Sequence, residues 1–500
     1  MALLLLFSVF VVSTCGLIYE LICGTLASYL LGDSITQFST IIGVYLFSMG
    51  VGSYLSKFID KNLIEFFIKI ELLIGLLGGF SALLLFVAFE FINHFRPLLY
   101  SIVFLIGCCV GLEIPLMMRI LKEHYTDFKD LVSKVFTFDY IGALLASLLF
   151  PLLLVPHLGL VRSALLFGLI NTSVGMLAIW SFRNTLNQHR LWYIKAMGCS
   201  VVLAIAFIFS NTLTTFAEAQ NYEGKILYSK STPYQRIVLT RNQNDIRLFL
   251  NGNLQFSSRD EYRYHEALVH LGLSQIASPK KVLVLGGGDG FAVREILKYP
   301  SVEEITLVDL DPAMTELFRC VPLLYDLNEK ALQSNKVKII HDDAFLWLRK
   351  NQQFFDFIVV DFPDPSNFSL GKLYSNAFYR TLYAALNQNG MAVIQSTSPL
   401  VARKSYWCIA NTLSSVGFFV KPYVTYVPAF GLWGYHLVAK SEQFSPTYRL
   451  PHSLKYLTQN LIPSLFNIPH DMDYLSTEIN ALNNQALVRY FEDEWLNYVG

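Results

Sequence analysis

Long apolar stretches dominate the first 210 residues of the chain. No charged side chain lies between Met1 and Tyr19, and the first acid is Glu20. The start lacks the basic residues of a cleavable signal, so it predicts a membrane anchor. Further stretches long enough to cross about 30 Å of hydrocarbon lie at residues 35–55, 70–92, 98–118, 135–155, 158–180 and 192–209. The pattern predicts a polytopic α-helical membrane domain over residues 1–210, with about seven helices.

After residue 210 the pattern changes to short alternating strands and amphipathic helices with scattered charge, which is typical of soluble domains. A small antiparallel β domain is predicted over residues 222–276, where Asn251-Gly252 favours a type I′ hairpin turn. Buried strands are predicted at residues 281–285, 304–308, 337–340, 357–360 and 392–395, with helical patterns between them.

Alternating strands and helices over residues 277–440 predict a mostly parallel, doubly wound sheet, an α/β domain of the class I methyltransferase-like (Rossmann) type. Residues 441–500 form a predicted helical tail, with an apolar-periodic helix near residues 480–498. We expect the tail to cover or dock on the preceding domain.

Composition narrows the classes of function. The chain is 53% hydrophobic and 15% charged, against about 25% charged in soluble proteins, and its mean hydropathy is +0.43. Lys+Arg and Asp+Glu both number 38, so no basic excess favours nucleic acid as a partner. The 7 cysteines contain no Cys-x-x-Cys pair, and neither a zinc site nor a disulfide framework is indicated.

Basic residues mark alternate loops of the predicted membrane domain, at residues 57–69, 119–134 and 183–190. By the positive-inside rule, these loops and the N-terminus lie in the cytoplasm, and an odd number of spans places the C-terminal half outside. A half-membrane hairpin around residues 151–160 would instead leave an even number.

Five acids lie at or near lipid depth, at Glu20, Glu71, Glu90, Glu113 and Asp139. Ionisable groups in a membrane are costly and suggest function. Because several lie near predicted span ends, where water can satisfy them, structural roles are favoured, and a transport path is the alternative.

A glycine-rich turn follows the first strand of the predicted Rossmann-type sheet, at Gly286-Gly287-Gly288-Asp289-Gly290. Glycines there let the backbone approach a ligand. The second strand ends at Asp309, where an acid accepts hydrogen bonds from ribose hydroxyls. Since Asp289 would repel a pyrophosphate, a cationic adenosine ligand such as a sulfonium is favoured over NAD.

Acids also follow the third and fourth strands, at Asp342-Asp343-Ala344 and at Asp361 and Asp364. Asp343 is also suited to a helix N-cap. The carboxyl ends of parallel strands meet at one crevice, so we expect these acids to gather there. Clustered carboxylates favour a positively charged substrate.

Together with residues 234–235, 250–255 and 259–266, these motifs resemble the spermidine synthase family of polyamine aminopropyltransferases. The resemblance covers roughly residues 222–440, and the apolar half resembles the membrane-anchored bacterial branch. It implies transfer of an aminopropyl group from decarboxylated S-adenosylmethionine, as co-substrate, to a diamine such as putrescine, giving spermidine and methylthioadenosine. It implies no metal and no permanently bound cofactor.

The resemblance also assigns roles. It implies that Asp361 accepts the proton. It implies polyamine binding by His265, Asp289, Asp364, Tyr264 and Gln255, and nucleoside binding by Gln235, Gly286, Gly288, Asp309, Asp343 and Ala344. It further implies a homodimer and a cytoplasmic catalytic domain on a cell-membrane protein, and that location conflicts with the seven-span count and the loop charges.

The chain departs from the family pattern at Phe362 and Pro363, where small polar residues are usual, and at Phe430, where a tyrosine is expected. The acceptor therefore stays open among putrescine, cadaverine, agmatine and spermidine. Residues 366–374 form either a lid or a plain surface loop. Two other functions remain as alternatives: an S-adenosylmethionine methyltransferase, and a polyamine transporter or sensor whose binding domain does not catalyse.

Overall fold

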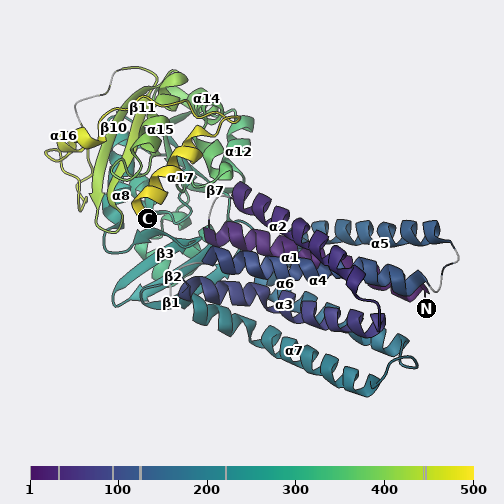
Figure 1. Ribbon diagram of the computed structural model, residues 1–500. Helices are drawn as coiled ribbons and strands as arrows, with labels where there is room; N and C mark the ends of the chain where they lie inside the picture. The colour runs from purple at the N-terminus through teal and green to yellow at the C-terminus, as the bar shows by residue number, and fades with distance from the viewer. Residues whose placement is uncertain are drawn as a thin grey trace. The chain divides into compact units, whose positions relative to one another are not determined.

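The computed structural model describes residues 2–31, 34–92, 95–122, 125, 127–219, 222–442, 444 and 448–499. The chain divides into two compact units, Met1–Lys225 and Ile226–Gly500, here called unit 1 and unit 2. Unit 1 is helical, whereas unit 2 combines sheets and helices (Figure 1).

Unit 1 is a bundle of long helices that lie side by side (Figure 1). They are α1 (Ala2–Leu31), α2 (Ser34–Leu55), α3 (Leu63–Phe91), α4 (Phe95–Leu121), α5 (Phe128–Leu149), α6 (Val155–Ser181) and α7 (His189–Ala219). Among the described residues, 6 helices are long and apolar enough to cross a membrane. This number is one less than the seven helices named above, because α5 and α6 are counted together as one helix of 54 residues, Phe128–Ser181.

This 54-residue segment folds back on itself. A π-helical stretch, Phe150–Leu154, joins α5 to α6, and Gly159 has a non-helical φ of 74°. On α1, Ser13 donates a hydrogen bond to the Asp139 carbonyl of α5 (2.8 Å), and Tyr19 donates to Asn171 of α6 (3.4 Å). Both arms thus lie beside the same part of α1. With 22 and 27 residues, each arm has the roughly 20 residues that a membrane span needs.

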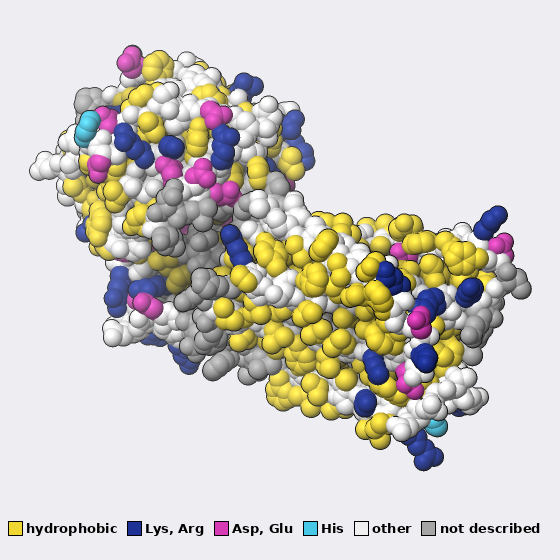
Figure 2. Space-filling model, viewed as in Figure 1, with side chains coloured by type: hydrophobic (Ala, Val, Ile, Leu, Met, Phe, Trp, Pro, Cys, Tyr) yellow, Lys and Arg dark blue, Asp and Glu magenta, His cyan; other side chains and the backbone are white. Residues whose placement is uncertain are grey.

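Apolar side chains cover much of the outer surface of unit 1, and basic side chains gather at the end of the bundle where the N-terminus lies (Figure 2). Among the exposed side chains are Phe47, Tyr140, Leu144, Leu152, Ile194 and Ile208. An exposed apolar surface of this extent is typical of a lipid-facing bundle, and it supports the membrane prediction.

Unit 2 begins with a four-stranded antiparallel sheet in the order β1-β2-β3-β4. Its strands are β1 (Lys225–Ser231), β2 (Arg236–Asn242), β3 (Asp245–Leu250) and β4 (Asn253–Ser257). Asn251 and Gly252 between β3 and β4 both have positive φ, 51° and 83°, as a type I′ turn requires. The predicted hairpin is confirmed.

The second sheet has seven strands in the order β10-β11-β9-β8-β5-β6-β7. The strands are β5 (Lys281–Gly286), β6 (Glu304–Asp309), β7 (Val337–His341), β8 (Phe355–Asp361), β9 (Leu386–Gln395), β10 (Phe419–Val427) and β11 (Gly431–Ala439). Strands β5 to β9 are parallel, whereas β11 is antiparallel to β9 and to β10. The predicted Rossmann-type domain with a small antiparallel sheet is confirmed.

Helices cover both faces of this sheet. One hydrophobic core joins it to the small sheet and to α8 (Glu261–Leu273), α9 (Phe291–Leu297), α10 (Pro312–Cys320), α11 (Pro322–Leu327) and α16 (Ile462–Leu465). The other core contains α12 (Ala344–Lys350), α14 (Asn376–Ala385), α15 (Arg403–Ser415) and α17 (Ala486–Val499). The strand order reverses between β5 and β8, so a ligand crevice is expected at their carboxyl ends.

Candidate active site

The glycine-rich turn after β5 brings the backbone against two acids. Gly286 and Gly287 have φ values of 79° and 65°, which favour glycine. A Cβ on Gly286 would collide with the Asp361 carbonyl, and one on Gly288 would lie 2.6 Å from Asp309 Oδ2. The turn therefore places bare backbone between Asp361 and Asp309.

Asp361 ends β8 and is held by an aromatic donor. The Tyr264 hydroxyl donates a hydrogen bond to Asp361 Oδ1 over 2.6 Å. Burial raises the pKa of Asp361, and the charge of His265 and the bond from Tyr264 lower it in part. A carboxylate balanced in this way is suited to accept a proton.

Two further acids of the site form no ion pair with Lys or Arg among the described residues. Burial raises the pKa of Asp289 to about 6, with His265 lowering it and Asp361 raising it. Burial also raises the pKa of Asp364 to about 6, against hydrogen bonds from Gln395 and Thr397. These acids together favour a cation.

Gln395, at the end of β9, fixes the position of Asp364. Its Nε2 donates to Asp364 Oδ1 (3.2 Å), to the Phe362 carbonyl (2.6 Å) and to the Tyr374 hydroxyl (3.0 Å). Its Oε1 accepts hydrogen bonds from the Trp433 ring (3.2 Å) and the Thr397 amide (3.0 Å). The sequence analysis missed Gln395, although it follows a parallel strand as the acids do.

The nucleoside side of the predicted site is built around β6. Asp309 Oδ1 accepts a hydrogen bond from the Asp311 amide (2.9 Å), and burial raises the pKa of Asp309 to about 6. Gln235 Nε2 and Thr232 Oγ1 donate to Asp311 Oδ2 over 3.0 and 2.8 Å. Gln235 therefore lies beside the end of β6, where Asp311, which was not among the predicted site residues, holds it.

Asp343 caps α12, as its position before a helix predicted. Its Oδ1 accepts from the amides of Phe345 (2.8 Å) and Leu346 (3.2 Å), and its Oδ2 pairs with Lys372 (2.5 Å). Burial raises the pKa of Asp343, but Lys372 and the helix amides together lower it by more than burial raises it. The net shift of the pKa is therefore downward. Ala344, the next residue, is buried at the start of α12.

The predicted lid segment, residues 366–374, contains α13 (Phe368–Gly371) and a short 3₁₀ turn, Lys372–Tyr374. The Asn480 side chain of the tail donates to the Gly371 carbonyl (3.0 Å), and the Asn376 amide donates to the Asn480 carbonyl (2.9 Å). The C-terminal tail therefore packs on this segment.

Phe362 and Phe430, which depart from the family pattern, lie in different surroundings. Phe362 points into the core, with its ring centroid 5.8 Å from that of Phe378. Phe430 has its ring centroid 6.2 Å from that of Tyr264 and 5.3 Å from that of Trp433, so it forms an aromatic wall. Gln255 donates to the Asn253 carbonyl of its own strand (3.2 Å), and no described contact joins it to the acids.

A buried ionic network that the sequence analysis missed lies behind His265. The His265 Nδ1 lies 3.0 Å from Glu261 Oε2, and Arg294 donates two hydrogen bonds of 2.9 Å to Glu261. Arg294 Nε also forms an ion pair with Glu295 Oε1 (2.8 Å). The other oxygen of Glu295 is hydrogen-bonded to His270 Nε2 (2.8 Å). His270 is fully buried within this network. The network fixes the His265 ring, which lies between Tyr264 and Phe291.

Taken together, the carboxyl ends of β5, β6 and β8 gather several acids, Asp289, Asp309, Asp361 and Asp364, beside a glycine-rich turn. Among the described residues, no group of three or more His, Cys, Asp or Glu side chains could hold a metal ion.

Comparisons with known proteins agree with this chemistry. The model of the spermine/spermidine synthase domain matches residues 261–449. The polyamine aminopropyltransferase of Leptospira interrogans serogroup Icterohaemorrhagiae serovar copenhageni is 52% identical over 491 residues, covering 98% of each chain. Polyamine aminopropyltransferase 2 of Ralstonia nicotianae is 50% identical over 503 residues, also covering 98% of each chain. A crystal structure of spermidine synthase with the transition-state analogue AdoDATO is 27% identical, with a TM-score of 0.46, and the match covers 49% of this chain and 86% of that one.

Proposed function

The chain belongs to the polyamine aminopropyltransferase family and is an enzyme of that class, and we propose that it forms spermidine from putrescine. In this proposal the donor is decarboxylated S-adenosylmethionine and the second product is methylthioadenosine. The observation that carries the proposal is a set of three acids at the carboxyl ends of the neighbouring strands β5 and β8, Asp289, Asp361 and Asp364, whose pKa values burial raises. Such a set requires cationic ligands, and both substrates are cations.

The reaction is a displacement at carbon. The acceptor nitrogen, after losing one proton, attacks the methylene carbon bonded to the sulfonium sulfur. The N–C bond forms as the C–S bond breaks, and the electron pair of that bond leaves with sulfur, which becomes the neutral thioether of methylthioadenosine. Asp361 accepts the proton, because it lies at the end of β8 with its carboxylate oriented by Tyr264.

The remaining acids position the two substrates. Asp364, held by Gln395, binds the far ammonium of the acceptor. Asp289, beside His265, binds an ammonium of the polyamine or of the aminopropyl group. Fixing both reactants in line converts the encounter into an effectively intramolecular step.

The nucleoside of the donor lies along the carboxyl ends of β5, β6 and β7. Asp309 binds the ribose, with the backbone of Gly286 and Gly288 close to the ligand. The adenine lies at Asp343 and Ala344, and Gln235 contacts the nucleoside side. Tyr264 and Gln255 line the acceptor channel.

The apolar wall at Phe430 favours a short diamine. Its ring has no hydroxyl and lies beside Tyr264 and Trp433, so it contacts methylene groups and offers no hydrogen bond to an additional amine. Putrescine, with a charged group at each end of a short methylene chain, fits this distribution.

A panel of acceptors tests the substrate proposal. The full chain is given decarboxylated S-adenosylmethionine with putrescine, cadaverine, agmatine or spermidine, and methylthioadenosine release is measured as kcat/KM for each amine. The highest kcat/KM is expected with putrescine. A higher value with another amine would refute putrescine as the acceptor, and no release with any amine would refute the donor assignment.

We also propose that unit 1 anchors the enzyme in the cell membrane with unit 2 in the cytoplasm, where the donor is made. If α5 and α6 each cross the membrane, the number of spans is odd. Together with the loop charges, an odd number would place unit 2 outside the cytoplasm. Reporter fusions after Trp180 and after Ser210 distinguish these outcomes. A reporter that is active only outside the cytoplasm after Ser210 would overturn the cytoplasmic placement.

A further inference from the structure

Two glutamates meet in the interior of unit 1. Glu71 of α3 is 0% exposed and Glu113 of α4 is 2% exposed. Their carboxyl groups lie close enough to interact with each other directly. Asn171 of α6 donates to Glu71 Oε2 over 2.9 Å, and Tyr19 of α1 donates to Asn171 Oδ1 over 3.4 Å. Four helices thus converge on one polar site, here called the carboxyl pair site.

The carboxyl pair site has no basic partner in the described part of the chain. The titratable groups that face it are Cys15 and Tyr19 on α1, Tyr45 on α2, Cys109 on α4 and Asp139 on α5. All of these are neutral or acidic. The ion pairs of unit 1 among its described residues, Arg119–Asp60 and Lys134–Asp130, involve neither glutamate.

The burial of two carboxyls side by side favours a proton on one of them. Two carboxylates carry only acceptors, so neither can satisfy the other unless one is protonated. In addition, Oε1 of Glu71 and Oε1 of Glu113 meet no hydrogen-bond donor among the described residues. Two unshielded charges in such an interior would repel each other strongly, and buried acids of this kind bind a proton instead.

The helices pack closely beyond Glu71. One turn from Glu71, a Cβ on Gly75 would lie 2.8 Å from Thr172 of α6 and 3.0 Å from the Gly168 carbonyl. A Cβ on Gly78 would lie 2.6 Å from the Tyr19 ring of α1. Glycines thus bring α3 close to α1 and α6 on this side of the carboxyl pair site.

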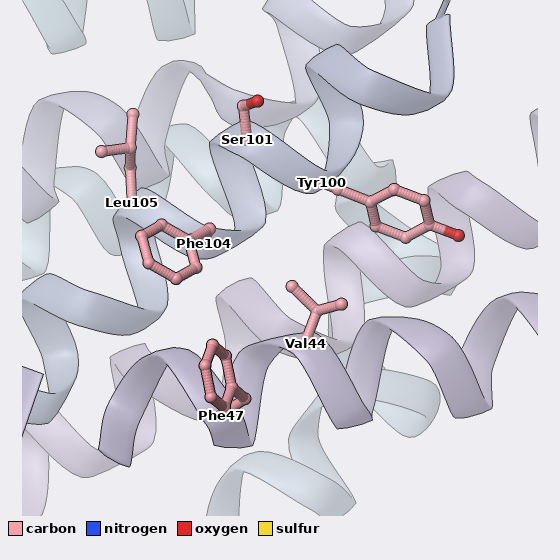
Figure 3. Close-up of a pocket in the computed structure, with 6 residues that line it drawn as sticks. All are labelled: Val44, Phe47, Tyr100, Ser101, Phe104 and Leu105. Carbon is pink, nitrogen blue, oxygen red and sulfur yellow. The ribbon is translucent and has the colours of Figure 1, made fainter. Parts of the chain in front are cut away.

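The hollow between α2 and α4 is not an alternative cation site. It is lined by Val44, Phe47, Tyr100, Ser101, Phe104 and Leu105 (Figure 3). Two of these side chains carry a hydroxyl and none carries a charge, so the hollow contains no acid to neutralise a cation.

We propose that Glu71 and Glu113 form a proton-binding site that holds at least one proton at neutral pH. Glu113 donates to Glu71, and Asn171 donates to the same carboxyl of Glu71. Loss of the proton would leave two charges between α3 and α4, so water or a cation would have to enter and the helices would separate. Proton occupancy is therefore coupled to the packing of unit 1. This role differs from both the structural role and the transport path considered for the membrane acids. The side chain of Glu90 lies outside the described residues.

Infrared spectroscopy of the full chain in lipid nanodiscs tests the proposal. The difference spectrum between the wild type and the Glu71→Gln/Glu113→Gln double variant at neutral pH should contain the carbonyl stretch of a protonated carboxylic acid. That band should shift in deuterated water. Glu65→Gln, at the start of the same helix, is the matched control and should leave the band in place.

The result is decisive in either direction. A difference spectrum that contains carboxylate bands and no carboxylic acid band would overturn the proposal. Helix content by circular dichroism shows whether the double variant folds. If it does not, the single variants Glu71→Gln and Glu113→Gln serve, since each must change the same acid band, and an unchanged band in both would also overturn it.

Discussion

The hydrogen bond from Tyr264 to Asp361 sets the protonation state of the proposed proton acceptor. Tyr264→Phe removes a donor that lies 2.6 Å from Asp361 Oδ1 and keeps the ring. A hydrogen bond to a charged group contributes about 1.5–3 kcal/mol, and one pKa unit corresponds to about 1.4 kcal/mol. Since this bond lowers the pKa of Asp361, its loss should raise that pKa by about 1 to 2 units.

The assay is the pH dependence of methylthioadenosine release between about pH 5 and 9, with saturating donor and putrescine. Asp361 must be ionised to accept a proton, so activity falls as the pH falls through its pKa. In Tyr264→Phe this acid limb should lie about 1 to 2 units higher. At a pH on the wild-type limb, the rate should be about 10 to 100 times lower.

Tyr423→Phe is the matched control. It removes another buried tyrosine hydroxyl, which donates to the Ala267 carbonyl over 2.9 Å, and it should leave the acid limb unchanged. An acid limb in Tyr264→Phe that coincides with that of the wild type would refute the role given to this hydrogen bond.

Three other predictions concern single residues of unit 2. The pKa of Asp364 is about 6 in the folded protein, above the unfolded value of about 3.9, so its stabilising contribution is complete below about pH 4 and lost by about pH 6. Asp364→Asn should remove this part of the pH dependence of thermal unfolding, and an unchanged slope would contradict it. Arg294→Met leaves Glu261 buried without its partner and should cost about 3–5 kcal/mol in denaturant unfolding; a loss below 1 kcal/mol would argue against the network. Asp309→Asn should raise the KM for the donor about tenfold and leave the KM for the amine unchanged, whereas a rise in both would contradict its nucleoside role.

Much of unit 2 could be predicted because its signals are local. Buried parallel strands form apolar runs, and the five predicted strands correspond to β5 to β9. The acids at strand ends then share a crevice because parallel strands share a carboxyl edge. Asp343 was predicted as an N-cap from its position alone, and its contacts confirm this.

The contacts that orient the acids could not be predicted from local patterns. Gln395 lies 31 residues from Asp364 along the chain, and Arg294 lies 33 residues from Glu261. Such pairs form only when the sheet and helices have packed. The direction of Phe362 also depends on packing, because its ring fills the core while its carbonyl accepts from Gln395.

In unit 1 the two apolar stretches predicted at residues 135–155 and 158–180 correspond to α5 and α6. Length and composition count Phe128–Ser181 as one helix, whereas the contacts of both arms with α1 show that it turns back. The family membership supports aminopropyl transfer over the methyltransferase and the non-catalytic sensor, because the relatives are named as polyamine aminopropyltransferases.

Asp361→Asn tests the central claim most directly. Methylthioadenosine release by the full chain is measured with decarboxylated S-adenosylmethionine and putrescine, and donor binding is measured separately by calorimetry. General-base catalysis contributes about 10²- to 10⁴-fold, so the rate should fall by at least about 100-fold while the donor still binds. A variant that binds the donor and releases methylthioadenosine at nearly the wild-type rate would contradict the assignment of Asp361 as the proton acceptor.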